Sequence, residues 1–97
     1  MSELRFDWDE RKNAANKRKH CVSFEDAQTV FLYEHALFAA DPDHSEGEDR
    51  FILLGLSSSL RTLVVCHCYH GNDLIRLISA RRANRLERSQ YELRRIQ

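Results

Sequence analysis

The chain has 97 residues, of which 42% are hydrophobic and 31% are charged, and its formal net charge is zero. This composition indicates one soluble globular domain over residues 1–97 and excludes an intrinsically disordered chain. The three cysteines argue against a disulfide framework, and the apolar runs are too short to span a membrane. No secretory signal is evident, so the expected location is a reducing cytoplasm, away from any membrane.

Opposite charges are concentrated in different parts of the sequence. Residues 11–20 hold five cations and no acid, and residues 81–97 hold six arginines against two glutamates. Residues 21–60 hold eight acids against Arg50 alone. Such sorting favours a basic surface that binds an anion, although segregation along a sequence can also disappear when the chain folds.

The first third of the chain predicts a short strand followed by two helices. Apolar and polar residues alternate over residues 4–8, which is typical of a short edge strand or an extended lead-in. Asp7 and Glu10 have the spacing of a capping box, so a cation-rich surface helix is expected over about residues 9–19. The apolar stripe between Ser23 and Leu32 predicts a second, shorter helix.

The middle of the chain predicts strands. Residues 36–39 form a candidate strand, and residues 41–49 read as a loop because proline, glycine and clustered acids oppose regular structure. Three strand-like runs follow over residues 50–57, 62–69 and 74–80. Their short connections predict antiparallel neighbours.

A last helix is expected over residues 85–96, because Asn84 and Glu87 have the spacing of a capping box. The predicted fold class is therefore α+β, with an antiparallel sheet of about four strands, two N-terminal helices and one C-terminal helix.

Four segments, in the right order and covering nearly the whole chain, resemble the BrnT toxin family. These segments are residues 6–9, 19–27, 41–45 and 76–83, and Glu48 to Arg50, Glu87 and Tyr91 also fit the family pattern. One departure is Cys21, which stands where the pattern usually has glycine. A glycine would suit a left-handed helix C-terminus, which a cysteine adopts at a cost of roughly 1 kcal/mol.

The resemblance implies a bacterial ribonuclease toxin of a type II toxin–antitoxin system, with a fold similar to that of RelE-type ribonucleases. Such a toxin inhibits translation and growth. The implied partner is a BrnA-like, DNA-binding antitoxin of the ribbon-helix-helix type. The complex is expected to repress its own operon, so that operator DNA is reached only through the antitoxin.

The expected chemistry is metal-independent RNA cleavage without a cofactor. It requires a base for the ribose 2′-OH, cations that stabilise charge on the phosphate, and an acid for the leaving 5′-oxygen. Cations and imidazoles can serve all three needs. The candidate catalytic residues are Lys19, His20, Arg50, His67, Arg76 and Arg81. The candidate RNA-binding residues are Arg18, Arg82 and Arg85.

Structural roles compete with catalysis at several of these positions. Arg76 lies between apolar residues of a strand, where it serves either a phosphate or a structural ion pair. Lys19 and His20 end a helix and suit its dipole without further function. His67 is either a core histidine or a general acid/base, and Glu87 reads as a helix cap rather than a base.

Cys66, Cys68 and His70 would share one face of a strand. Structural zinc normally takes four ligands, and a fourth is not evident, so we expect no metal. Two other functions fit the same arginines, because phosphate contacts dominate affinity in each. One is a non-catalytic module that binds RNA or the ribosome, and the other is a co-repressor subunit.

Overall fold

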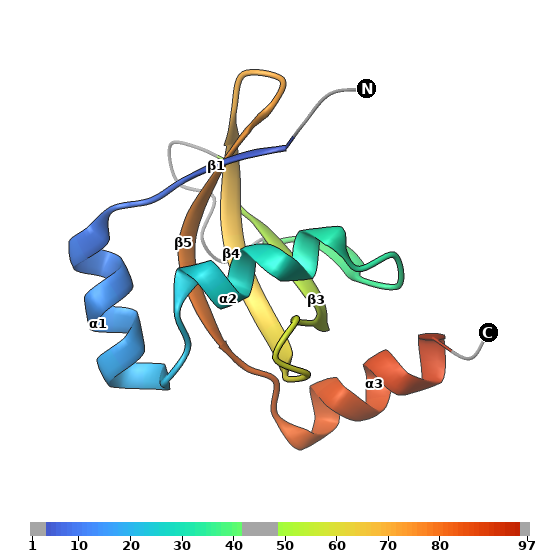
Figure 1. Ribbon diagram of the computed structural model, residues 1–97. Coiled ribbons are helices and arrows are strands. Elements are labelled where there is room, and N and C mark those ends of the chain that lie inside the picture. Colours follow the sequence, from blue (N-terminus) through green and yellow to red (C-terminus); the bar gives the residue numbers. More distant parts are fainter. Residues whose placement is uncertain (1–3, 42–48, 96–97) are drawn as a thin grey trace.

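The computed structural model describes residues 4–41 and 49–95 (Figure 1). Its elements, in chain order, are β1 (Arg5–Asp7), α1 (Glu10–His20), α2 (Phe24–Gln28), the 3-10 helix η1 (Thr29–Leu32), β2 (Leu37–Ala40), β3 (Phe51–Leu56), β4 (Thr62–His70), β5 (Leu74–Arg82) and α3 (Arg85–Arg95). The α+β class is thus confirmed, and the expected helices and strands occur close to their predicted positions. No helix within the described residues is long and apolar enough to cross a membrane.

The sheet has five strands in the order β1-β5-β4-β3-β2. Strands β2 to β5 are antiparallel neighbours, whereas β1 runs parallel to β5, with Phe6 opposite Ile75. The expectation of a wholly antiparallel sheet of about four strands was therefore wrong. Alternation of residues identifies an edge strand, but the strand that it joins and its direction depend on contacts between distant segments.

The hydrophobic core lies between one face of the sheet and the segment that forms α2 and η1 (Figure 1). We call this side the helix face; it carries Leu53, Leu63, Val65, Ile75 and Leu77, which pack against Val22, Phe24, Ala27 and Val30. The other side, here the distal face, carries the alternate residues of the same strands. Helix α3 lies over the β2–β3 part of the distal face, because Leu93 lines a groove with Ile52 and Leu54.

Helix α1 begins at Glu10, one residue later than predicted. Asp9 is its N-cap, and the Asp9 carboxylate accepts a hydrogen bond from the backbone N–H of Arg11 at 2.8 Å. The predicted cap at Asp7 was wrong, because pairing with β5 holds Asp7 in an extended strand. The Asp7 carboxylate instead forms an ion pair with Arg76.

Two buried asparagines, rather than an apolar stripe, attach α1 to the rest of the molecule. The side-chain amide of Asn16 donates to the carbonyl oxygens of Val22 and Ala80 and accepts from the N–H of Ala80. The side-chain oxygen of Asn13 accepts from the N–H of Phe24 at 2.9 Å. Asn16 thus satisfies backbone groups of β5 beyond the point where β1 ends.

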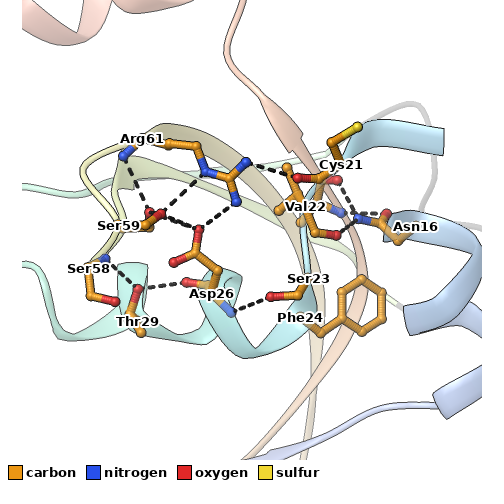
Figure 2. A network of polar contacts seen from close by, with 12 residues as sticks. Asn16, Cys21, Val22, Ser23, Phe24, Asp26, Thr29, Ser58, Ser59 and Arg61 are labelled. Atoms are coloured by element: carbon orange, nitrogen blue, oxygen red, sulfur yellow. Dashed lines mark hydrogen bonds and ion pairs between the residues drawn. The ribbon is translucent and has the colours of Figure 1, made fainter. Parts of the chain in front are cut away.

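A polar network joins the α1–α2 connection to the turn between β3 and β4 (Figure 2). Asp26 accepts hydrogen bonds from Ser59 at 2.7 Å and from Arg61 at 3.0 Å, and Arg61 also donates to the carbonyl oxygen of Cys21. Cys21 has the left-handed conformation expected at that position, with φ 59° and ψ 30°. Ser23 is the N-cap of the second helix, since its hydroxyl oxygen accepts from the N–H of Asp26.

A cationic pocket as the candidate functional site

A bulge in β5 decides which side chains reach the distal face. Cys66 pairs with Ser79 and His67 pairs with Leu77, which leaves Ile78 as an extra residue. An extra residue resets the alternation of a strand. Ser79 therefore shares the distal face with Arg76 and Arg81. Without the bulge, simple alternation along β5 would place Ser79 on the face of Ile75 and Leu77.

The distal face contains a pocket of about 330 Å³. It is lined by Asp41, Arg50, Ile52, Val64, Cys66, Ile78, Ser79 and Arg81. The pocket brings together two predicted catalytic cations, Arg50 and Arg81, from different strands. Sequence reasoning missed Asp41 as a member of this group. Its only signal was its place at the start of the acidic segment, opposite Arg50 once β2 and β3 pair.

Arg50, which lines this pocket, has one buried hydrogen-bond donor without an acceptor among the described residues. Its backbone oxygen accepts from the N–H of Asp41 at 2.9 Å, which extends the β2–β3 pairing by one residue. Its Nε atom is buried and makes no hydrogen bond within the described part of the chain. A buried guanidinium N–H without an acceptor is costly, and an anion oxygen in the pocket would satisfy it.

Arg81 is held at the pocket by a carboxylate of α3. Both of its terminal nitrogens donate to Glu87, each at 2.8 Å. These hydrogen bonds hold the pKa of Glu87 below its ordinary value and raise the pKa of Arg81. Glu87 also completes the capping box with Asn84, as predicted from their spacing. A carboxylate so occupied is a poor general base.

The thiol of Cys66 lies in the same pocket. Burial is the largest cause that raises its pKa, and the charge of Asp41 acts in the same direction. Arg50 and a hydrogen bond with Ser79 oppose this rise without cancelling it. Because the thiolate is the reactive form, Cys66 is not an activated nucleophile at neutral pH.

Arg76 lies on the distal face, one row along the sheet from the pocket. Arg76 of β5 pairs with Cys68 of β4. On the other side of β4, Arg50 is directly opposite Cys68, because Phe51, the residue after Arg50, pairs with His67. The Cα atoms of Arg76 and Arg50 are thus two strand spacings apart, roughly 10 Å. In the described structure Arg76 is paired with Asp7.

His67 lies on the helix face, on the opposite side of the sheet from Arg50 and Arg81. Its side chain is fully buried, and its ring packs edge-on against Phe31. Its Nδ1 atom lies 3.2 Å from the carbonyl oxygen of Val65, and its Nε2 atom lies 3.2 Å from the hydroxyl of Tyr69. Burial lowers the pKa of His67. The surroundings are those of a core histidine.

The remaining predicted cations lie outside the pocket. Arg18, Lys19 and His20 form the last turn of α1, which lies beside β5 (Figure 1). Arg82 lines a second hollow, of about 260 Å³, together with Arg61 and Arg88. Arg85 is exposed at the start of α3. The structure therefore places Arg50, Arg76 and Arg81 on the distal face, buries His67 in the core, and scatters the other five predicted residues over the surface.

The suspected metal-binding strand holds one close pair. The sulfur of Cys68 lies 3.6 Å from Nε2 of His70. Within residues 4–41 and 49–95, no three His, Cys, Asp or Glu side chains gather as metal ligands would.

The fold and the pocket define a class of small α+β proteins with two arginines in one hollow of the sheet, an arrangement typical of anion-binding sites. The sequence identifies the family within that class. Residues 8–87 match the family model described as the ribonuclease toxin BrnT of type II toxin–antitoxin systems, and the chain belongs to this family. An antitoxin partner follows from that membership. The resemblance deduced from the sequence is confirmed.

A solved structure supports the same fold. The chain is similar to the ribonuclease toxin BrnT of Brucella abortus, whose crystal structure was determined at 1.1 Å resolution. The two share 24% sequence identity, and the match covers 86% of this chain and 100% of that chain with a TM-score of 0.64. No curated protein sequence matches the chain.

Proposed function

We propose that this protein is a metal-independent endoribonuclease whose active site is the pocket of Arg50 and Arg81. The observation that carries the proposal is the buried Nε atom of Arg50, which makes no hydrogen bond among the described residues. A phosphate oxygen is the acceptor that this geometry suits, because guanidinium groups bind phosphate through charge-assisted hydrogen bonds. The ribonuclease description of the family gives independent support.

In this scheme the two arginines stabilise the charge that develops on the scissile phosphate. Asp41 supplies a carboxylate in the same pocket to accept the proton of the ribose 2′-OH. The 2′-oxygen bonds to phosphorus as the P–O5′ bond breaks, and solvent water protonates the leaving 5′-oxygen, which gives a 2′,3′-cyclic phosphate and a 5′-OH end. Arg76 binds a neighbouring phosphate on the same face. Arg18, Lys19, His20, Arg82 and Arg85 form a surface that attracts the RNA strand.

The proposal includes the biological setting that the family suggests. The toxin acts in the cytoplasm, where RNA cleavage inhibits translation and growth. A BrnA-like antitoxin of the ribbon-helix-helix type neutralises it, and the pair represses its own operon through the antitoxin's contact with operator DNA. The proposed fold relationship is to RelE-type ribonucleases.

The test is RNA cleavage by the purified chain in EDTA. We expect cleavage by the unaltered protein, and about 100-fold slower cleavage by Arg50→Met, since losing one preorganised donor costs roughly that factor. Arg11→Met is the matched control, because Arg11 is an exposed cation of α1 outside the pocket. Cleavage that requires a divalent ion would contradict the mechanism. Binding of RNA without cleavage would favour the non-catalytic module. Absence of both RNA binding and cleavage would favour the co-repressor subunit.

A further inference from the structure

Among residues 4–41 and 49–95, strand β2 is an unprotected edge of the sheet. It is the last strand in the sheet order, and its four residues, Leu37 to Ala40, include no charged residue and no proline. Phe38, Ala39 and Ala40 are exposed. Natural edge strands are usually blunted by charges, prolines or bulges, because their free backbone groups invite another strand. The other edge, β1, is flanked by the ion pairs Arg5–Asp73 and Asp7–Arg76.

The register shows which backbone groups of β2 face away from the sheet. The N–H of Asp41 donates to the carbonyl oxygen of Arg50, so this pair is a hydrogen-bonded one. Backbone groups alternate between the two sides of an antiparallel strand. Leu37 and Ala39 therefore bond to β3, whereas the N–H and C=O groups of Phe38 and Ala40 point toward the free edge.

An apolar groove of about 390 Å³ runs beside this edge. The sheet contributes Leu37, Phe38, Ala39, Ile52 and Leu54, and α3 contributes Gln90, Leu93 and Arg94. Leu93 is 62% exposed, so a large apolar side chain borders the groove. The ring of Phe38 instead stacks on Phe51 on the helix face, and it is 55% exposed there. Ile52 also lines the cationic pocket, so the groove and the pocket are neighbours on the distal face.

We infer that the antitoxin adds an extended segment to β2 as a sixth strand and fills the groove with apolar side chains. Backbone hydrogen bonds and side-chain pockets on alternate residues are the features of strand addition. Acidic residues of the segment meet Arg94 at the groove. Because the groove adjoins the pocket, the bound segment obstructs RNA. This account of inhibition rests on the proposed function, whereas the docking site itself rests on the edge strand and the groove.

Two other occupants fit these observations less well. An RNA strand carries no row of peptide groups to pair with Phe38 and Ala40. A second copy of this chain would bring a second α3, on which Arg85, Arg88 and Arg94 outnumber Glu87 and Glu92 among the described residues. Like charges brought together at an interface oppose association.

The first experiment measures binding of the purified antitoxin encoded beside this chain's gene. Ala40→Pro removes the outward N–H of Ala40 and leaves the bonds of Ala39 to β3, whereas the control Ala40→Val keeps the N–H. Proline is tolerated on an edge strand where the N–H faces solvent. We expect Ala40→Pro to bind the antitoxin at least about tenfold more weakly, since losing a contact at the centre of an interface costs roughly that factor. Ala40→Val should bind it with unchanged affinity. Equal affinities of the two variants would overturn strand addition.

The second experiment tests the groove without touching a strand. Leu93→Glu places a charge in the groove, and Leu86→Glu places the same charge on α3 outside it, at a residue of similar exposure. We expect Leu93→Glu to weaken antitoxin binding about tenfold or more and Leu86→Glu to leave it unchanged. Unchanged antitoxin affinity in Leu93→Glu would overturn the proposal. If RNA cleavage by that variant is slower as well, the groove binds RNA instead. If the free protein cleaves no RNA, the proposed function fails while the affinities still decide the docking site.

Discussion

The guanidinium of Arg81 and the carboxylate of Glu87 form two parallel hydrogen bonds, each 2.8 Å long. One oxygen of the same carboxylate also accepts from the N–H of Asn84 at 2.8 Å. A single side chain thus caps α3 and holds a cation at the edge of the pocket. A bound RNA phosphate would compete with Glu87 for the Arg81 guanidinium.

Glu87→Gln is expected to strengthen RNA binding by about three- to tenfold at low salt, because one more uncompensated cation then faces the phosphates. Glutamine preserves the capping box, so α3 should remain. The loss of stability should be at most about 1 kcal/mol, since the ion pair is partly exposed. Fluorescence anisotropy with labelled RNA measures the affinity. Glu92→Gln makes the same charge change on α3, and an equal gain in that variant would contradict a specific role for Glu87.

Arg76→Ala is expected to abolish toxicity while the protein stays folded. The ion pair of Arg76 with Asp7 is partly exposed on both sides, and such pairs contribute about 1 kcal/mol or less. Growth after induced expression measures toxicity, and thermal unfolding measures stability. Asp7→Ala breaks the same ion pair but keeps the arginine, so it should remain toxic. Loss of toxicity in both variants would show that the ion pair, not the cation, is needed.

Lowering the pH below about 6.5, the ordinary pKa of histidine, is expected to destabilise the protein through His67. Burial lowers the pKa of His67 in the folded state, so between that lowered value and 6.5 the unfolded state binds more protons. The stabilisation is complete above pH 6.5 and decreases as the pH falls through this window.

Urea unfolding at several pH values measures this dependence. His67→Phe should flatten it and should still cleave RNA, because the ring lies on the helix face. His35→Gln, at an exposed histidine, should keep the wild-type dependence. A catalytic role for His67 would instead appear as loss of cleavage in a folded His67→Phe variant.

Cys21→Gly is expected to raise the free energy of unfolding by about 0.5–1 kcal/mol. Cys21 has φ 59°, a conformation that costs a residue with a Cβ atom roughly 1–2 kcal/mol, partly offset by the greater chain entropy of glycine when unfolded. The hydrogen bond from Arg61 reaches the backbone oxygen of this residue and is kept. Urea unfolding of Cys21→Gly beside Cys21→Ala tests the idea. An equal gain in Cys21→Ala would assign the effect to loss of the thiol.

Features that depend on neighbouring residues could be predicted from the amino-acid sequence. The caps at Ser23 and Asn84 bond to groups three residues away, so their spacing predicts them directly. The αL position at Cys21 was evident for the same reason, as a residue that ends a helix. Strands β3 to β5 follow from alternation and short turns, and the family was evident because its motifs are short and ordered along the chain.

Contacts between residues far apart in the sequence could not be predicted in this way. The parallel pairing of β1 with β5, and the burial of Asn16 against Ala80, depend on groups far apart in the sequence. The extra residue Ile78 moved Ser79 to the other face, which no alternation rule predicts. Arg50 and Arg81 share a pocket while His67 faces away from it, because the sheet lies between its two sets of side chains. Caps and periodicity depend on neighbours along the chain, whereas a site depends on how strands register and pack.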